Sequence, residues 1–269
     1  MLLNISYKTE FKIDGVLNAG YQRVILSPKS SNSQKVNNWE LNVTGGVKEI
    51  LTNDHFNNHV NLIRISDDSN KIIVKVKGEV NTFNTHGISE MNKKDIPLWC
   101  YSQQSKLTQP GKHIKNFSKK IKLKEDNIIE DLHLLSNFIK DEIKYKPGST
   151  TYRTAAEEAI QLKKGVCQDH TQIFLSIVRI NNYPCRYVSG FLLTDKDNQN
   201  LAMHAWAEVY IQDLGWVGYD VANGISPDDR YISVAKGFDY NDVVPIKGVL
   251  KGNLTEAHKI KLSIKSINE

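Results

Sequence analysis

The chain has 269 residues, of which 40% are hydrophobic and 24% are charged, and its 35 basic and 30 acidic side chains give a net charge of +5. These fractions are ordinary for a globular protein and exclude a disordered tail, a collagen-like chain and a low-complexity polymer. The length allows one large domain or two moderate ones, and the mild positive charge is weak evidence for a nucleic-acid partner.

Neither a membrane span nor an export signal is visible in the sequence. No run of about 18 apolar residues occurs, so no membrane partner is expected. The first residues, MLLNISYKTEF, lack the basic and apolar regions of a signal peptide. The three cysteines, Cys100, Cys167 and Cys185, are too few and too odd in number for a disulfide framework. These features predict a cytoplasmic protein.

The first 115 or so residues alternate apolar and polar side chains, as β-strands with one buried face do. Polar turn segments separate these runs, and strands this frequent predict an antiparallel β-sandwich. The predicted strands cover residues 1–13, 21–26, 39–43, 47–51, 60–65 and 71–80.

Residues 84–120 look irregular, and we place a domain boundary within them. The N-terminal β-sandwich-like domain is expected to cover residues 1–118 and the second domain residues 119–269. The first segment holds 15 basic and 10 acidic residues (15 − 10 = +5), so it carries the whole charge excess. A solvated sheet face explains these lysines better than a binding site for an acidic partner. Because aromatic and basic residues are not interleaved there, no nucleic-acid partner is expected.

The second segment changes to a helical period. Apolar residues spaced by three and four predict an amphipathic helix over residues 126–145. The capping-box pattern Thr154-Ala-Ala-Glu157 predicts a short helix that ends at Leu162, and a further helix is predicted over residues 168–181. Strand-like runs follow at residues 186–193, 205–211 and 215–221. Helices followed by strands predict an α+β fold.

Cys167 is a candidate nucleophile because it lies at the predicted start of a helix. The unpaired N–H groups and the dipole of a helix N-terminus favour the thiolate form of cysteine, and Gly165 allows a substrate to approach the backbone closely. The alternative is that Cys167 is a small buried hydrophobic residue. His204 begins one predicted strand and Asp220 ends the next, so neighbouring antiparallel strands can bring them together as an imidazole oriented by a carboxylate.

The sequence segments around Cys167, His204 and Asp220 are more specific evidence than the order of these three residues along the chain. Four segments, GVCQD at 165–169, PCRYVSG at 184–190, HAWAEV at 204–209 and GWVGYD at 215–220, resemble the transglutaminase-like superfamily of papain-type cysteine enzymes. They are most similar to its bacterial branch, whose members are usually described as cysteine proteases. The first half is similar to the N-terminal β domain of that branch, at residues 21–28, 39–43, 54–58 and 80–83.

The resemblance implies an N-terminal antiparallel β-sandwich followed by a papain/transglutaminase-like α+β catalytic core. It implies a catalytic triad with Cys167 as nucleophile, His204 as acid and base, and Asp220 as the residue that orients the imidazole. Thiolate attack on an amide would then give a thioester.

Four further residues are candidates for the oxyanion site or the substrate cleft. Gln168 could supply a donor, although the backbone N–H of Cys167 is the better oxyanion candidate, and Gln161 has the spacing of a papain-type oxyanion glutamine but lies on the preceding predicted helix. Trp206 fits core or cleft-wall packing better than a specific ligand contact. Asp169 could cap the helix or pair with Arg186, and capping is the favoured interpretation. His170, one turn after Cys167, is expected to pack or face solvent rather than tune the thiolate.

The predicted activity is hydrolysis of peptide or isopeptide amide bonds by a cysteine protease or amidase, with a peptide or protein as substrate. Transfer of the acyl group to an amine, as in a protein-glutamine transglutaminase, is an alternative, and a non-catalytic peptide-binding module is another. No metal and no cofactor are expected, because the sequence has no CxxC, no HExxH and no acidic calcium loop.

Overall fold

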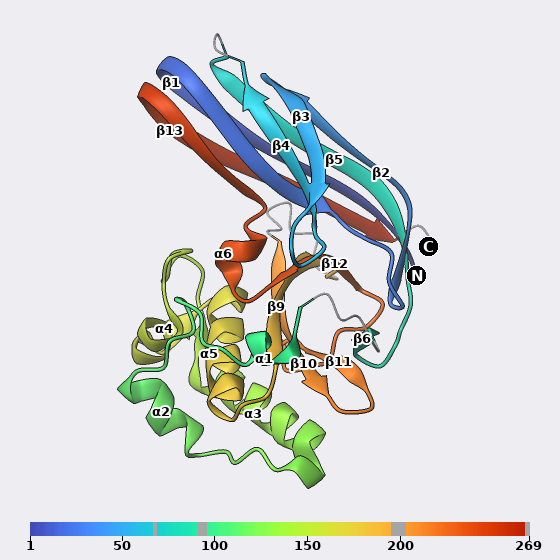
Figure 1. Ribbon diagram of the computed structural model, residues 1–269, viewed down its shortest axis with the longest axis vertical. Helices are drawn as coiled ribbons and strands as arrows, with labels where there is room; N and C mark the ends of the chain where they lie inside the picture. The colour runs from blue at the N-terminus through green and yellow to red at the C-terminus, as the bar shows by residue number, and fades with distance from the viewer. Residues whose placement is uncertain (67–68, 91–95, 195–202, 267–269) are drawn as a thin grey trace.

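A computed structural model describes residues 1–66, 69–90, 96–194 and 203–266. Two antiparallel sheets lie one beyond the other, and most of the helices gather against the second sheet at the end of the molecule away from the first (Figure 1). The α+β prediction is therefore confirmed. Among the described residues, none of the helices is both long enough and apolar enough to span a membrane.

The first sheet is built from the first five strands and the last one. Five of its strands follow the order β2-β5-β1-β4-β3, and β13 pairs with β1. The bounds are β1 (Leu2–Ser27), β2 (Gln34–Thr44), β3 (Gly46–Asn53), β4 (His59–Ile65), β5 (Lys71–Thr82) and β13 (Ile246–Ser266).

Strand β1 is continuous where the sequence predicted two strands. Its first half pairs with β5 and its second half with β4, while β13 follows it along both halves. The register with β13 shifts between Leu17 and Ala19, close to Gly15 at φ 116°, and bulges of this kind bend a strand without ending it. One apolar cluster contains Leu3 and Ile5 from the first half together with Val24 from the second. The expected sandwich thus takes the form of one sheet folded over a shared core.

The second sheet has the order β12-β9-β10-β11-β6 and is antiparallel throughout. Its strands are β6 (Ile88–Glu90), β9 (Cys185–Leu192), β10 (His204–Ile211), β11 (Gly215–Tyr219) and β12 (Tyr231–Gly237). A small parallel pair joins β7 (Lys144–Tyr145) to β8 (Lys164–Gly165). The helices are α1 (Leu98–Tyr101), α2 (Lys112–Ser118), α3 (Ile128–Glu142), α4 (Ala156–Leu162), α5 (Cys167–Ile180) and α6 (Tyr240–Val243), with a 3-10 turn at Glu125–Asn127.

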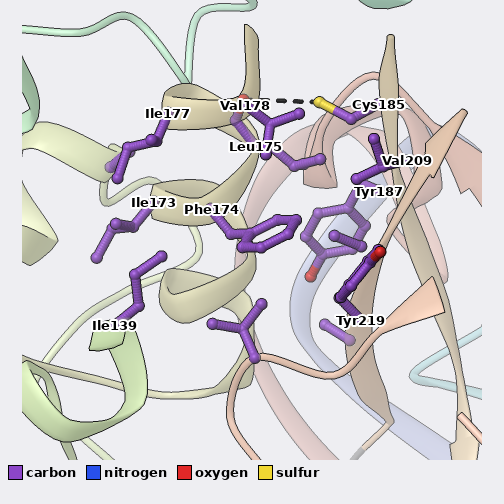
Figure 2. Close-up of a cluster of buried hydrophobic side chains, with 14 of the residues drawn as sticks. Ile139, Ile173, Phe174, Leu175, Ile177, Val178, Cys185, Tyr187, Val209 and Tyr219 are labelled. Carbon is purple, nitrogen blue, oxygen red and sulfur yellow. Dashed lines mark hydrogen bonds between the residues drawn. The ribbon is translucent and has the colours of Figure 1, made fainter. Parts of the chain in front are cut away.

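Helix α5 is the central element of the second half because almost its whole length is buried. Its apolar face packs on the second sheet, with the Phe174 ring 5.5 Å from that of Tyr219 (Figure 2). Cys185 lies in the same core, where its thiol faces the Leu175 carbonyl oxygen at 3.6 Å. Burial raises the pKa of the Cys185 thiol to about 11, so this cysteine has a packing role. All three cysteines are free thiols.

The chain crosses the predicted boundary at residue 118 in both directions. Strand β6 joins the second sheet by pairing with β11, and α2 packs among the helices of the core. Strand β13, by contrast, returns to the first sheet, from Val24↔Ile246 to Leu3↔Ser266. The sequence could not indicate this return, because the partner strands lie at opposite ends of the chain.

The capping pattern before α4 is used differently from the prediction. Glu158, not Glu157, accepts a hydrogen bond from the N–H of Ala155, at 2.9 Å. Glu157 instead caps another helix: it accepts from the N–H groups of Gly111, His113 and Ile114 at 2.8–3.0 Å, at the start of α2. A carboxylate satisfies such free N–H groups well, so Glu157 fastens α2 to α4.

Candidate active site

Cys167 is the first residue of α5, where the backbone changes from the short strand β8 to a helix. Asp169 caps this start: its Oδ2 accepts hydrogen bonds from the N–H of Val166 and from the Thr150 hydroxyl, each at 2.7 Å. The Cys167 side chain stays partly accessible. The thiol therefore lies at the positive end of a fourteen-residue helix, which favours a negative charge there.

His204 and Asp220 lie together opposite Cys167. His204 begins β10 and Asp220 directly follows β11, the strand that pairs with β10. Nε2 of His204 is 2.6 Å from Oδ2 of Asp220, and Cys167 lies close enough to the imidazole to raise its pKa. The structure thus places the imidazole between a thiol and a carboxylate, which is the arrangement of an activated nucleophile.

Asp220 is fully buried and well supplied with donors. Its Oδ2 also accepts from the Tyr231 hydroxyl at 2.6 Å and from Nδ2 of Asn223 at 2.7 Å. Burial by itself would raise the pKa of Asp220, but its hydrogen bonds with His204, Tyr231 and Asn223 and the charge of His204 lower it. Asp220 is therefore ionised.

Asp220 and Cys167 both shift the pKa of His204. Burial would lower its pKa, but the hydrogen bonds and charges of Asp220 and Cys167 outweigh burial and raise the pKa to about 10. At neutral pH the imidazole holds its proton, ready to give it to a leaving group.

Tyr145, at the end of β7, also contacts the nucleophile. Strand β7 is held beside β8 by the hydrogen bond from Lys146 N to Gly165 O at 2.8 Å. The pKa of Tyr145 rises to about 12, first because of burial and then because of the Cys167 charge. Tyr145 is therefore close enough to Cys167 for the two side chains to act on each other electrostatically.

The other predicted site residues have different surroundings. Nε2 of Gln168 donates to the Tyr152 carbonyl oxygen at 3.2 Å, and Trp206 is buried with its ring stacked 6.4 Å from that of His204. Gln161 is exposed on α4 and has no recorded contact with Cys167, His204 or Asp220 among the described residues. Asp169 is engaged in the helix cap. Trp206 therefore packs beside the His204 ring, whereas Gln161 does not join the group formed by Cys167, His204 and Asp220.

One expectation about the neighbourhood of Cys167 is wrong, and two alternatives left open by the sequence are decided. Gly165 does not leave room for a substrate, because a Cβ there would lie 2.6 Å from the Cβ of Asp169. Arg186 pairs with Glu208 and Glu90, at 2.6 and 3.2 Å, and not with Asp169. His170 is buried, with its ring nitrogens 2.8 and 2.9 Å from backbone carbonyl oxygens, so it packs rather than facing solvent.

Sequence reasoning missed the roles of Tyr145, Asn223 and Tyr231. Neither Tyr145, at the end of a predicted helix, nor Tyr231, outside the predicted elements, gives a sign in the sequence of what its hydroxyl contacts. Asn223 follows Asp220 by three residues, the spacing of a local turn in which an Asp side chain accepts from the backbone. That spacing was the one available signal.

No metal centre is built into this region. Among residues 1–66, 69–90, 96–194 and 203–266, no three His, Cys, Asp or Glu side chains are grouped so as to hold a metal ion.

Two family models match the chain. Residues 115–221 match the transglutaminase-like superfamily, and residues 3–81 match the bacterial transglutaminase-like N-terminal region. The first match contains Cys167, His204 and Asp220, and the second contains β1 to β5 except for their ends. The two matches thus follow the two sheets.

Relatives and a solved structure show the same relationship. An uncharacterized protein of Mycobacterium tuberculosis is 26% identical over 276 aligned residues, which cover 93% of this chain and 87% of that protein. An uncharacterized protein of Mycobacterium leprae is 34% identical over 122 residues, 44% of this chain and 43% of that protein. A crystal structure from Cytophaga hutchinsonii, described as a putative cysteine protease, has a TM-score of 0.78 at 18% identity and covers 100% of this chain and 92% of its own. That structure shares the fold.

Proposed function

This chain belongs to the transglutaminase-like superfamily and is a cysteine-dependent enzyme, and from that premise we propose that it hydrolyses amide bonds of peptide or protein substrates through a thioester on Cys167. The observation that carries the proposal is the position of His204, which is hydrogen-bonded to Asp220 and lies beside Cys167. A thiolate, a protonated imidazole and a buried carboxylate in that order suit acyl transfer from an amide.

In the first half-reaction, Sγ of Cys167 attacks the amide carbonyl carbon. The C–S bond forms, and the carbonyl oxygen becomes an oxyanion, for which the N–H of Cys167 and the Tyr145 hydroxyl are the proposed donors. The C–N bond then breaks as His204 transfers its proton to the leaving nitrogen. The products are a free amine and a thioester, and His204 is left neutral.

In the second half-reaction, water adds to the thioester. His204 takes a proton from the water as its oxygen bonds to the acyl carbon, and the C–S bond breaks to release a carboxylic acid and the Cys167 thiolate. Asp220, fixed by Tyr231 and Asn223, holds the imidazole in place through both steps and stabilises its charged form. The cycle returns the enzyme to its starting protonation state.

The nucleophile is tested by alkylation with iodoacetamide at pH 6. Cys167 is expected to react much faster than a free thiol, because a cysteine at a helix N-terminus beside an imidazole is an activated nucleophile. His204→Ala should abolish this excess, and Cys100→Ser, which removes another partly accessible thiol, should leave it unchanged. A rate equal to that of a free thiol would favour the non-catalytic peptide-binding module.

The reaction itself is tested by mass spectrometry on a peptide library incubated with a primary amine. Hydrolysis predicts products shortened at an amide bond, with one water gained per cut, and none with the Cys167→Ala variant. Loss of ammonia with coupling of the added amine would instead identify a protein-glutamine transglutaminase and overturn the hydrolase. The cytoplasmic location expected from the sequence remains a prediction.

A further inference from the structure

A groove of about 560 Å³ opens where the first sheet meets the catalytic core. Strands β1 and β13 form one wall, and the loop before α4 and helix α6 form the other, at the junction seen between the sheet and the helices (Figure 1). The residues that line the groove include Phe11, Gln22, Tyr152, Arg153, Tyr240 and Lys247. The groove is not part of the triad, and the reaction steps above do not use it.

The wall of this groove contains an unsatisfied polar group. The Gln22 side chain is 3% exposed, and its Oε1 has no hydrogen-bond partner among the described residues. Gly248 lies opposite Gln22 in the pairing of β1 with β13, and a Cβ on Gly248 would lie 2.8 Å from Cγ of Gln22. A buried amide without a partner costs free energy, so a ligand that supplies the partner gains that energy on binding.

The groove adjoins the nucleophile through two tyrosines. The Tyr152 carbonyl oxygen accepts a hydrogen bond from Gln168, the neighbour of Cys167. The ring of Tyr240 is 6.2 Å from that of Tyr187, and the pKa of Tyr240 is raised by burial and then by the Cys167 charge. The Gln168–Tyr152 contact therefore links the lining of the groove to the first turn of α5, which carries Cys167.

The charge of the groove is one-sided. Arg153 and Lys247 are exposed at its rim, and no carboxylate belongs to its lining among the described residues. Arg23, which faces Lys247 across the pairing of β1 with β13, donates to the carbonyl oxygen of Asp242 at 3.0 Å and adds a third positive charge behind the rim. Such a rim attracts acidic groups and repels basic ones.

The backbone at the groove also suits an extended ligand. Strand β13 pairs with β1 and with no other strand in the described parts of the chain, so its second edge is open from Ile246 to Leu250. An open edge accepts an extended peptide through main-chain hydrogen bonds. Phe11 and the tyrosines give apolar surface for its side chains.

We propose that this groove binds an extended segment of the substrate polypeptide beside the scissile amide and selects segments that carry an acidic side chain. The Gln22 amide bonds the segment, Phe11 and Tyr240 contact an apolar side chain, and Arg153 and Lys247 pair with the acidic one. This selectivity rests on the proposed hydrolase, and it gives the first sheet a direct part in substrate binding.

The charge selectivity is tested with a random dodecapeptide library and mass-spectrometric identification of the cut sites. The wild-type protein should prefer an acidic residue at a fixed distance from the cut, and the double variant Arg153→Glu/Lys247→Glu should lose or reverse that preference. Each exposed charge is expected to change the preference about 2- to 5-fold. Lys35→Glu/Lys77→Glu makes the same change in net charge on exposed lysines of β2 and β5 and should leave the preference unchanged.

The Gln22 contact is tested by Gln22→Met, which keeps the side-chain length and removes both polar atoms. The variant should lose about 5- to 20-fold in kcat/KM, since one hydrogen bond to the substrate is worth that much. Its Tm should hold or rise, because the unsatisfied atom is gone. A merely structural glutamine would show the reverse, a lower Tm with kcat/KM unchanged, and that result would overturn the role of Gln22.

Binding to the Cys167→Ala variant separates the groove from the proposed reaction. In one outcome the wild-type protein cuts no peptide, the Cys167→Ala variant retains acidic dodecapeptides from the library, and adding Arg153→Glu/Lys247→Glu to that variant reduces the retention. The groove proposal then stands and the hydrolase proposal fails. If peptides are cut with no charge preference, the hydrolase stands and the groove proposal is overturned. Neither cutting nor selective retention overturns both.

Discussion

Asp220 receives hydrogen bonds from His204, Tyr231 and Asn223 on the single oxygen Oδ2, while its side chain is out of contact with water. So many donors on one buried atom fix both the charge and the direction of the carboxylate. The fixed carboxylate in turn keeps His204 protonated, with a pKa of about 10. Removing the charge of Asp220 should therefore change the protonation of His204.

Asp220→Asn is expected to lower kcat/KM at pH 8 by about 10²- to 10⁴-fold. Without the carboxylate charge, the pKa of His204 falls toward or below its ordinary value of about 6.5, because burial still disfavours the charged ring. The alkaline limb of kcat/KM against pH, expected near pH 10 in the wild-type protein, should therefore move to lower pH. Asp213→Asn is the matched control, because Asp213 is an exposed turn residue at φ 65° that asparagine tolerates.

The same pair makes stability depend on pH. The folded-state pKa of His204 lies above the unfolded value, so its contribution is complete below about pH 6.5 and is lost as the pH rises through about 10. Urea unfolding at a series of pH values should show this loss in the wild-type protein and a much smaller one in Asp220→Asn. Parallel curves for the two proteins would contradict the assigned pair.

Tyr145→Phe tests the hydroxyl beside the nucleophile. If this hydroxyl stabilises the oxyanion, its removal should lower kcat on the order of 10²-fold with KM nearly unchanged, because the contact strengthens only in the transition state. Tyr21→Phe, at a half-exposed tyrosine of β1, serves as the control. An unchanged kcat in Tyr145→Phe would leave the N–H of Cys167 as the oxyanion donor without the tyrosine.

At the scale of elements, Glu157 joins the two short helices α2 and α4. Glu157→Ala should lower the free energy of unfolding by about 1–2 kcal/mol, because three N–H groups at the start of α2 lose their acceptor. Glu158→Ala, which removes one bond to Ala155, should cost less. Urea unfolding at pH 7 measures both.

The Glu157 effect should vanish in acid. The hydrogen bonds of Gly111, His113 and Ile114 lower the pKa of Glu157 despite the opposing effect of burial. Its contribution is therefore complete above the unfolded value of about 4.3 and disappears as the pH falls through the lower folded value. A wild-type and variant difference that persists at pH 2 would contradict the capping role.

Helices and strands with a strong local period could be predicted from the sequence, and contacts between elements could not. The helix at 126–145 is found as α3, and the helix at 168–181 as α5, because an apolar stripe at helical spacing is a local property. The strands predicted at 1–13 and 21–26 are parts of the single strand β1, because β13 pairs with both and with the segment between them. Glu157 and Glu158 compete for one capping role, and only the position of α2 decides between them.

For the site, the sequence pattern and the family resemblance named Cys167, His204 and Asp220, and the structure brings these three together. Their roles in the reaction remain predictions. The spacing from Cys167 is the only feature that makes Gln161 an oxyanion candidate. Spacing along the chain is a poor guide to distance in space when the residue lies on a different helix. Tyr231 could not be foreseen, because its partner Asp220 lies eleven residues away across a turn whose path the sequence does not specify.

At the scale of the whole molecule, two amide side chains join the sheets. Gln34 exchanges two hydrogen bonds with the backbone of Ser233, both at 2.8 Å, and Asn58 exchanges two with the backbone of Lys236, at 2.8 and 2.9 Å. Strand β12 is at the edge of the second sheet, so these amides complete its open edge in place of a neighbouring strand. Both side chains are buried.

The double variant Gln34→Ala/Asn58→Ala should therefore lower the free energy of unfolding on the order of 1–3 kcal/mol for each lost side chain, because it leaves buried backbone groups of β12 unpaired. Urea unfolding followed by tryptophan fluorescence measures the change. Asn38→Ala, which removes an exposed amide bonded to Glu79, should stay within about 0.5 kcal/mol of the wild-type protein. Equal decreases in the free energy of unfolding of Gln34→Ala/Asn58→Ala and of Asn38→Ala would contradict the role of Gln34 and Asn58 in joining the sheets.

The pairing of β1 with β13 also sets an order of events during synthesis. Leu3 pairs with Ser266, 263 positions later (266 − 3), and the strands that carry His204 and precede Asp220 lie between them. At about 5–20 residues per second, the ribosome needs roughly 13–50 s to cover that distance. During this interval the emerging β1 has β5 and β4 on one edge and nothing to pair with on the other. The nucleophile helix is therefore made well before the last strand that closes the first sheet.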